Sequence, residues 1–183
     1  MDKRLFFLLL FTAAAGLTTG VFFEVYMTGS GKTDLLDLLS AYLKTEEGLP
    51  FMQTAVQNIW RETLWFLLCV FMRFVPAALL PLLFAAAVLA LSCKGFFLGF
   101  SAAMVLEAMG LPGIPHLTLC LFPSGMIQLL LFAALISYSI REVNKKRTAS
   151  QYSVKQSLLT YLIGAAVLTF SVLLRAALLQ AMT

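Results

Sequence analysis

The polar side chains that could do chemistry in this chain lie mostly inside long apolar runs. Arg73, Lys94, Glu107, Gln128 and Arg175 all lie within such runs or at their ends. A charge in a membrane costs a few kcal/mol unless it is paired, reaches the interface or lines a wet cavity, so these residues are candidates for an intramembrane polar site. They could equally serve structure alone, because Arg73 and Arg175 could reach the interface and Lys94 could mark the end of a helix.

No catalytic or metal-binding pattern accompanies these residues. The single histidine, His116, has no carboxylate within helical reach, and no Ser/His/Asp set or HExxH motif occurs. Gly29-Ser-Gly-Lys-Thr33 looks like the end of a phosphate-binding loop, but that motif needs a glycine where this chain has Tyr26. We therefore expect a protein that is not an enzyme and that uses no metal or cofactor.

The composition is that of a membrane protein. Of 183 residues, 61% are hydrophobic and 12% are charged, whereas a soluble domain has about half and about a quarter, respectively. A helix needs about 20 apolar residues to cross the bilayer, which leaves room for about five crossings. Runs rich in Leu, Ala and Phe favour helices over a closed barrel. We expect an all-α bundle of transmembrane helices forming a single domain over residues 1–183.

The apolar runs predict where the helices cross. We expect spans at about 5–26, 63–84, 86–109, 117–140 and 157–179, an extracytoplasmic loop at 27–62 and a basic loop at 141–156. The junction between the second and third spans is open. In another register, the second span ends near Arg73 and the third starts at Pro76, and that third span is either long or broken at Lys94-Gly95.

Basic residues predict the orientation. Lys3 and Arg4 precede the first span, and five of the thirteen cations lie between Arg141 and Lys155. By the positive-inside rule, both segments face the cytoplasm and the loop at 27–62 lies outside the cell membrane. The net charge of +4 is thus interpreted as a topology signal, and no nucleic-acid partner is expected.

The outer loop contains one short amphipathic segment. Its apolar residues recur at helical spacing behind Thr33 or Asp34, and they are Leu35, Leu36, Leu38, Leu39, Tyr42 and Leu43. Such a helix could lie on the outer leaflet, dock a partner, or pack on the end of the protein's own bundle.

Small residues recur at a spacing of four in two spans. Gly16 and Gly20 lie in the first span, and Gly95 and Gly99 follow Lys94. This spacing lets membrane helices approach closely. It favours packing within the bundle over a contact between copies in a homo-oligomer.

Two stretches together resemble the stage II sporulation protein M family of small bacterial membrane proteins. The first is Arg73-Phe-Val-Pro76 followed, after an apolar run, by Lys94-Gly-Phe-Phe-Leu-Gly-Phe-Ser101. The second is Phe122-Pro-Ser-Gly-Met-Ile-Gln128, in which Pro123, Gly125 and the two apolar residues after Gly125 match the family's pattern. The chain departs from that pattern at Ser124, where many members have His or Gln, and at Gln128, where many have Glu.

The resemblance implies a role in sporulation. A family member sits at the sporulation septum of endospore-forming Gram-positive bacteria and anchors two peptidoglycan hydrolases, stage II sporulation proteins D and P, during engulfment. The expected function is thus a membrane scaffold, with the amphipathic outer segment as the docking surface. The alternative is a small membrane transport component, because intramembrane charges and Pro-broken helices also line binding sites.

Overall fold

The computed structural model describes residues 3–47, 51–111, 113–147 and 154–182, and every regular element in these ranges is helical. The long helices are α1 (Lys3–Tyr26), α2 (Ser30–Glu47), α3 (Phe51–Met72), α4 (Leu80–Met109), α6 (Phe122–Arg147) and α7 (Val154–Met182). Three short elements connect them: the 3₁₀ turn η1 (Ala77–Leu79), α5 (Gly113–Pro115) and the π-helix η2 (His116–Leu121). The predicted all-α class is confirmed.

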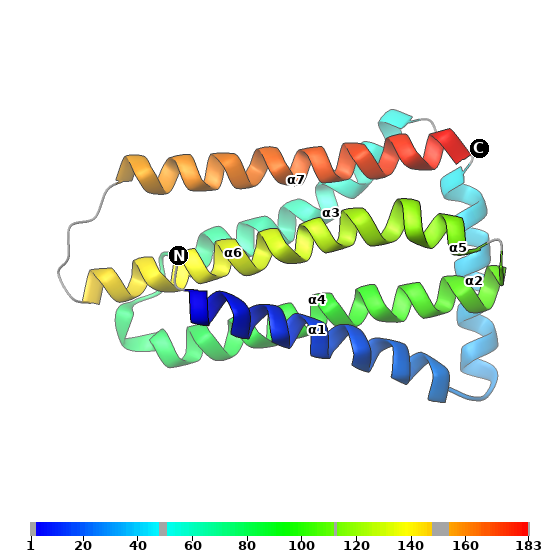
Figure 1. The fold of residues 1–183 in the computed structure, drawn as a ribbon, viewed down its shortest axis with the longest axis horizontal. Helices are drawn as coiled ribbons and strands as arrows, with labels where there is room; N and C mark the ends of the chain where they lie inside the picture. The colour runs from blue at the N-terminus through cyan, green and yellow to red at the C-terminus, as the bar shows by residue number, and fades with distance from the viewer. Residues whose placement is uncertain (1–2, 48–50, 112, 148–153, 183) are drawn as a thin grey trace.

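Five of the long helices run lengthwise, and α2 lies across one end of the bundle (Figure 1). The first helix starts in the left half of the view, and the last one ends at the right. Four helices, at Lys3–Tyr26, Ala77–Met109, Phe122–Lys145 and Ser157–Ala181, are long and apolar enough to cross a membrane. Helix α3 is not among them, so the fifth crossing stays a prediction.

The boundary between α3 and α4 lies at Arg73–Pro76, not in the middle of the apolar run. Helix α3 ends in tight turns, in which the Arg73 N–H donates to Val70 and the Phe74 N–H to Phe71. Pro76 is extended, with a ψ of 141°. Proline has no N–H to donate and disfavours a helical conformation of the residue before it, so α3 does not continue through Pro76. The helix bounds that we expected here, 63–84 and 86–109, are therefore wrong.

Helix α4 continues unbroken through Lys94 and Gly95 to Met109. Neither a break at Lys94-Gly95 nor a helix end at Lys94 occurs. The helix starts with Pro81 in its first turn, where proline is tolerated. It ends where Gly110 adopts a positive φ of 61°, and the Gly110 N–H donates to the Leu106 carbonyl at 2.8 Å.

Much of the expected outer loop and basic loop is also helical. Helix α3 begins at Phe51 and already buries Ala55, Asn58 and Glu62 at helical spacing. Two of these three core positions are polar, so the apolar pattern of the sequence did not reveal this half of the helix. Likewise, α6 begins at Phe122 after the π-helical turn and continues to Arg147.

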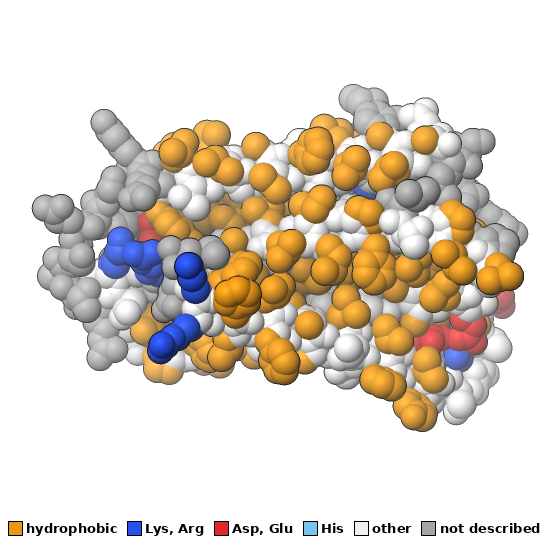
Figure 2. Space-filling model, in the orientation of Figure 1, with side chains coloured by type: hydrophobic (Ala, Val, Ile, Leu, Met, Phe, Trp, Pro, Cys, Tyr) orange, Lys and Arg blue, Asp and Glu red, His pale blue; other side chains and the backbone are white. Residues whose placement is uncertain are grey.

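Helix α6 forms the centre of the bundle. In the apolar 18-residue stretch of α6, 56% of the residues are buried, compared with 17% to 33% in the other three candidate spans. Phe132, Ala133 and Ile136 of α6 pack with Leu9 of α1 and Leu91 of α4 in one core. By contrast, the outer surface in Figure 2 is hydrophobic along most of its length, and Lys and Arg side chains gather at the left end. Such a surface suits a bilayer.

Candidate functional site

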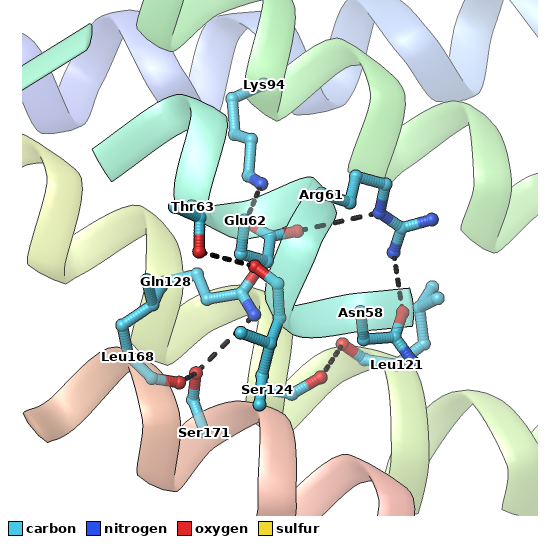
Figure 3. A network of polar contacts seen from close by, with 11 residues as sticks. Asn58, Arg61, Glu62, Thr63, Lys94, Leu121, Ser124, Gln128, Leu168 and Ser171 are labelled. Atoms are coloured by element: carbon cyan, nitrogen blue, oxygen red, sulfur yellow. Dashed lines mark hydrogen bonds and ion pairs between the residues drawn. The ribbon is translucent and has the colours of Figure 1, made fainter. Parts of the chain in front are cut away.

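A group of charged side chains lies between α3, α4 and α6. The Lys94 ammonium forms an ion pair with the Glu62 carboxylate, and the two side chains are only 14% and 5% exposed. It also lies over the rings of Trp65 and Phe132, 5.3 and 5.2 Å from their centroids, where cation–π attraction adds to the pairing. Figure 3 shows Lys94 reaching across to Glu62 from the neighbouring helix.

The second oxygen of Glu62 interacts with Arg61. Arg61 Nε lies 3.8 Å from Glu62 Oε1 and its Nη2 donates to Asn58 Oδ1 at 3.2 Å (Figure 3). The Arg61 side chain is 53% exposed, unlike its two partners. One carboxylate therefore contacts two cations, one buried and one at the surface.

A cavity of about 330 Å³ opens beside this group. Its polar lining comes from four helices and includes Arg61, Glu62, Lys94, Ser124, Gln128 and Arg175, and its apolar lining includes Trp65, Phe97, Leu98, Leu121 and Leu129. The Gln128 amide donates to Ser171 of α7 at 3.4 Å, which directs it across the helix interface (Figure 3). The structure thus brings Lys94, Gln128 and Arg175 to one site, together with Gly125.

Glu107 belongs to a different group, at the α2 end of the bundle. Lys32 of α2 pairs with Glu107 of α4 at 2.6 Å and with Glu24 of α1 at 3.1 Å. The hydrogen bond to Glu107 raises the pKa of Lys32 above its usual value. Because the folded pKa is the higher one, this contribution to stability is complete at neutral pH and is lost only as the pH rises through it.

Arg73 belongs to a third group, at the opposite end. Its Nε lies 3.3 Å from Glu142 Oε2, and its guanidinium lies over the ring of Tyr161 at 5.9 Å. The Tyr161 hydroxyl shares a hydrogen bond of 2.7 Å with Ser139, whose hydroxyl lies 3.0 Å from the carbonyl of Cys69. These contacts connect α3, α6 and α7 near the break before Pro76.

The expected polar residues are therefore divided among three groups, each of which connects different helices. Sequence reasoning missed the carboxylates that complete them: Glu62, Glu24 and Glu142. Glu24 offered a signal, since it lies inside the first apolar run. Glu62 and Glu142 offered none, because they precede or follow apolar runs and only the packing turns them inward.

The four glycines lie where α1 crosses α4. A Cβ at Gly16 or Gly20 would overlap backbone atoms of Ser92 or Phe96, and one at Gly95 or Gly99 would overlap the backbone of Ala13 or Leu17. The two helices therefore touch backbone to backbone, as closely spaced small residues permit. The glycine spacing serves packing within this chain.

The expected docking residues lie on α2. Leu35 is 37% exposed, Leu36 is half-buried, and the neighbouring Leu38 is 68% exposed. The backbone of Leu39, Tyr42 and Leu43 is helical, but their side chains lie outside the described part of the structure. Helix α2 thus presents leucines to the outside at the end of the bundle.

Among the described residues, no three His, Cys, Asp or Glu side chains lie close enough to hold a metal ion. No family model, curated protein or solved structure matches this chain. The four apolar helices and the apolar surface define its class: a helical membrane protein.

Proposed function

We propose that this protein is a non-enzymatic membrane scaffold that anchors peptidoglycan hydrolases at the sporulation septum. The observation that carries the proposal is the arrangement of α2. This helix is tied to α1 and α4 through Lys32, while Leu35 and Leu38 remain exposed. A preformed helix that is anchored to the bundle and has exposed leucines is suited to binding another protein, because less ordering is needed on binding.

The charged groups support the same proposal. Each of the three groups joins side chains from different helices, so their pairing holds the bundle together. In the proposed topology the five lengthwise helices cross the cell membrane and the N-terminus is cytoplasmic. The end that carries α2 then faces outward, where stage II sporulation proteins D and P act on peptidoglycan.

Binding to these hydrolases tests the scaffold. The protein in lipid nanodiscs is used to capture the extracytoplasmic parts of the two hydrolases, in its native form and with Leu35→Ser, Leu39→Ser and Tyr42→Ser combined. We expect the triple variant to bind at least roughly tenfold more weakly, since the loss of a single anchor that contributes about 1.4 kcal/mol already lowers the affinity tenfold.

The matched control is Asp34→Ser, which changes an exposed residue on the same helix outside the apolar stripe. It is expected to leave capture unchanged. Equal capture by the native protein and the triple variant would remove α2 as the docking surface, and no capture by the native protein would remove the scaffold proposal.

A second candidate function is a small membrane transport component. The cavity of about 330 Å³ favours it, because charged and aromatic side chains from four helices converge there. A transport component must bind a ligand inside the membrane, whereas a scaffold need not. A gene for an ATPase beside this one would favour the transport function.

A further inference from the structure

Three charged side chains meet where α2 joins the bundle: Glu24 of α1, Lys32 of α2 and Glu107 of α4. The Lys32 ammonium lies 2.6 Å from Glu107 Oε2 and 3.1 Å from Glu24 Oε1. The carboxyl groups of Glu24 and Glu107 also lie within hydrogen-bond reach of each other. Ionised carboxylates only accept hydrogen bonds, so a hydrogen bond between two carboxyl groups requires a proton on one of them.

The surroundings make two negative charges costly at this place. Glu24 and Glu107 line a cavity of about 440 Å³, and every other residue in its described lining is apolar. Two carboxylates that share one cation in such a site repel each other, which favours uptake of a proton by one of them. The cluster therefore has the arrangement of a carboxyl pair that holds a single proton.

Burial and distance distinguish the two carboxyl groups. The Glu24 side chain is 4% exposed, whereas that of Glu107 is 40% exposed, so water stabilises a charge on Glu107 far better than one on Glu24. The contact of Lys32 with Glu107 is also the shorter one, as a charge-assisted hydrogen bond would be. By contrast, Glu24 Oε1 is buried and accepts no hydrogen bond from the described residues, although the ammonium is near. Glu24 is thus the group that takes the proton.

The neighbouring elements bring no further charge to this cluster in the part of the chain that the structure describes. Helices α1, α2 and α4 contribute one charged group each, and η2 and α6 contribute Leu117 and Phe122 to the lining of the cavity. The side chain of His116, in η2, lies outside the described residues. Among the described residues, the charges that act on each carboxyl group are those of Lys32 and of the other carboxyl group.

We propose that Glu24 and Glu107 form a proton-binding site, in which Glu24 holds one proton at neutral pH and donates a hydrogen bond to the Glu107 carboxylate. Lys32 then donates to the ionised Glu107 and lies against the neutral Glu24, so the three groups together carry no net charge. The proton thus completes the contact that holds α2 to α1 and α4. The site needs no docked partner, so the proposal goes beyond the scaffold function and does not depend on it.

Infrared spectroscopy detects this proton directly, because the carbonyl stretch of a protonated carboxylic acid lies above the carboxylate and amide bands. The full chain is measured at neutral pH in maltoside micelles, which contain no ester carbonyl. We expect a carboxylic-acid band in the difference spectrum between the native protein and Glu24→Gln, and we expect that band to shift in D₂O. The subtraction removes the contribution of the other buried carboxyl groups.

Glu107→Gln separates a shared proton from one that burial alone would place on Glu24. With Glu107 replaced by a neutral amide, Lys32 has Glu24 as its carboxylate partner, so Glu24 should ionise and the band should be lost in this variant too. Asp34→Asn, which changes an exposed carboxyl group on α2, is the matched control and should keep the band. The proposal is overturned if the native protein lacks the band, or if the band persists in Glu107→Gln.

Thermal unfolding gives a second measurement of the same site. Glu24→Gln keeps a donor for Glu107 and an acceptor for Lys32, so its midpoint should lie within roughly 2 °C of the native value. Glu24→Leu offers neither and should lower the midpoint by roughly 4 °C or more. Equal losses in the two variants would contradict a neutral Glu24 at this position.

Discussion

Lys94→Met is expected to destabilise the protein by about 3–5 kcal/mol, because it leaves the Glu62 carboxylate buried without its strongest partner. Glu62 is only 5% exposed, and Lys94 is its partner on the neighbouring helix. Arg61 is a weaker substitute, since it lies farther from Glu62 and is half in solvent. Glu62→Leu alone should also destabilise, by leaving the Lys94 ammonium against aromatic rings.

The double variant Glu62→Leu/Lys94→Met separates pairing from packing. An apolar pair of similar size removes both desolvation costs, so we expect it to recover most of the stability lost by either single change. The measurement is the free energy of unfolding of the four proteins in mixed micelles. Losses that simply add in the double variant would show that the two side chains do not interact. Arg141→Gln, at an exposed site, should change little.

Gly95→Ala is expected to destabilise the protein by about 2 kcal/mol or more, because the added methyl would overlap the Ala13 backbone. A side chain could move aside, but a helix backbone can only do so by separating α1 from α4. The same argument applies to Gly16, Gly20 and Gly99, each of which faces backbone atoms of the other helix.

Gly31→Ala is the matched control for this change. Gly31 is also helical, but its nearest neighbour would be the end of the Met27 side chain at 3.9 Å. There, Ala should be neutral or stabilise by up to about 1 kcal/mol, through lower entropy of the unfolded chain. Thermal unfolding followed by circular dichroism compares the two variants. Similar midpoints for both would contradict a backbone contact between α1 and α4.

Local features of the sequence predicted most of the helices. The apolar runs located α1 and α7 to within three residues at each end, because length and hydrophobicity alone decide whether a helix suits a bilayer. They also indicated α6, but its bounds, Phe122–Arg147, lie five and seven residues beyond the expected 117–140. Pro76 offered the correct boundary between α3 and α4 as one of two registers. The other register, with its junction near residue 85, failed because Leu80–Met109 is one continuous helix. The possible break of the third span at Lys94-Gly95 does not occur either, because Lys and Gly are both compatible with a helix interior.

The polar site was predictable only in part. Costly charges and amides in apolar runs can be identified from the sequence, and three of them are Lys94, Gln128 and Arg175. The structure shows that these three residues line one cavity. Glu62 was not, since it lies 32 residues from Lys94 and before its own apolar run. The identity of an ion-pair partner depends on which helix faces cross, and helical spacing within a segment carries no information on that.

By itself, the sequence determined that this is a helical membrane protein, since hydrophobicity and chain length are local properties. It also indicated that glycines at a spacing of four would form a close helix contact. Tertiary structure alone decided that Gly16 and Gly20 meet the α4 backbone, that Glu62 pairs with Lys94, and that Glu107 pairs with Lys32 instead. These are contacts between distant segments, and they exist only once the packing of the helices has chosen one arrangement among many.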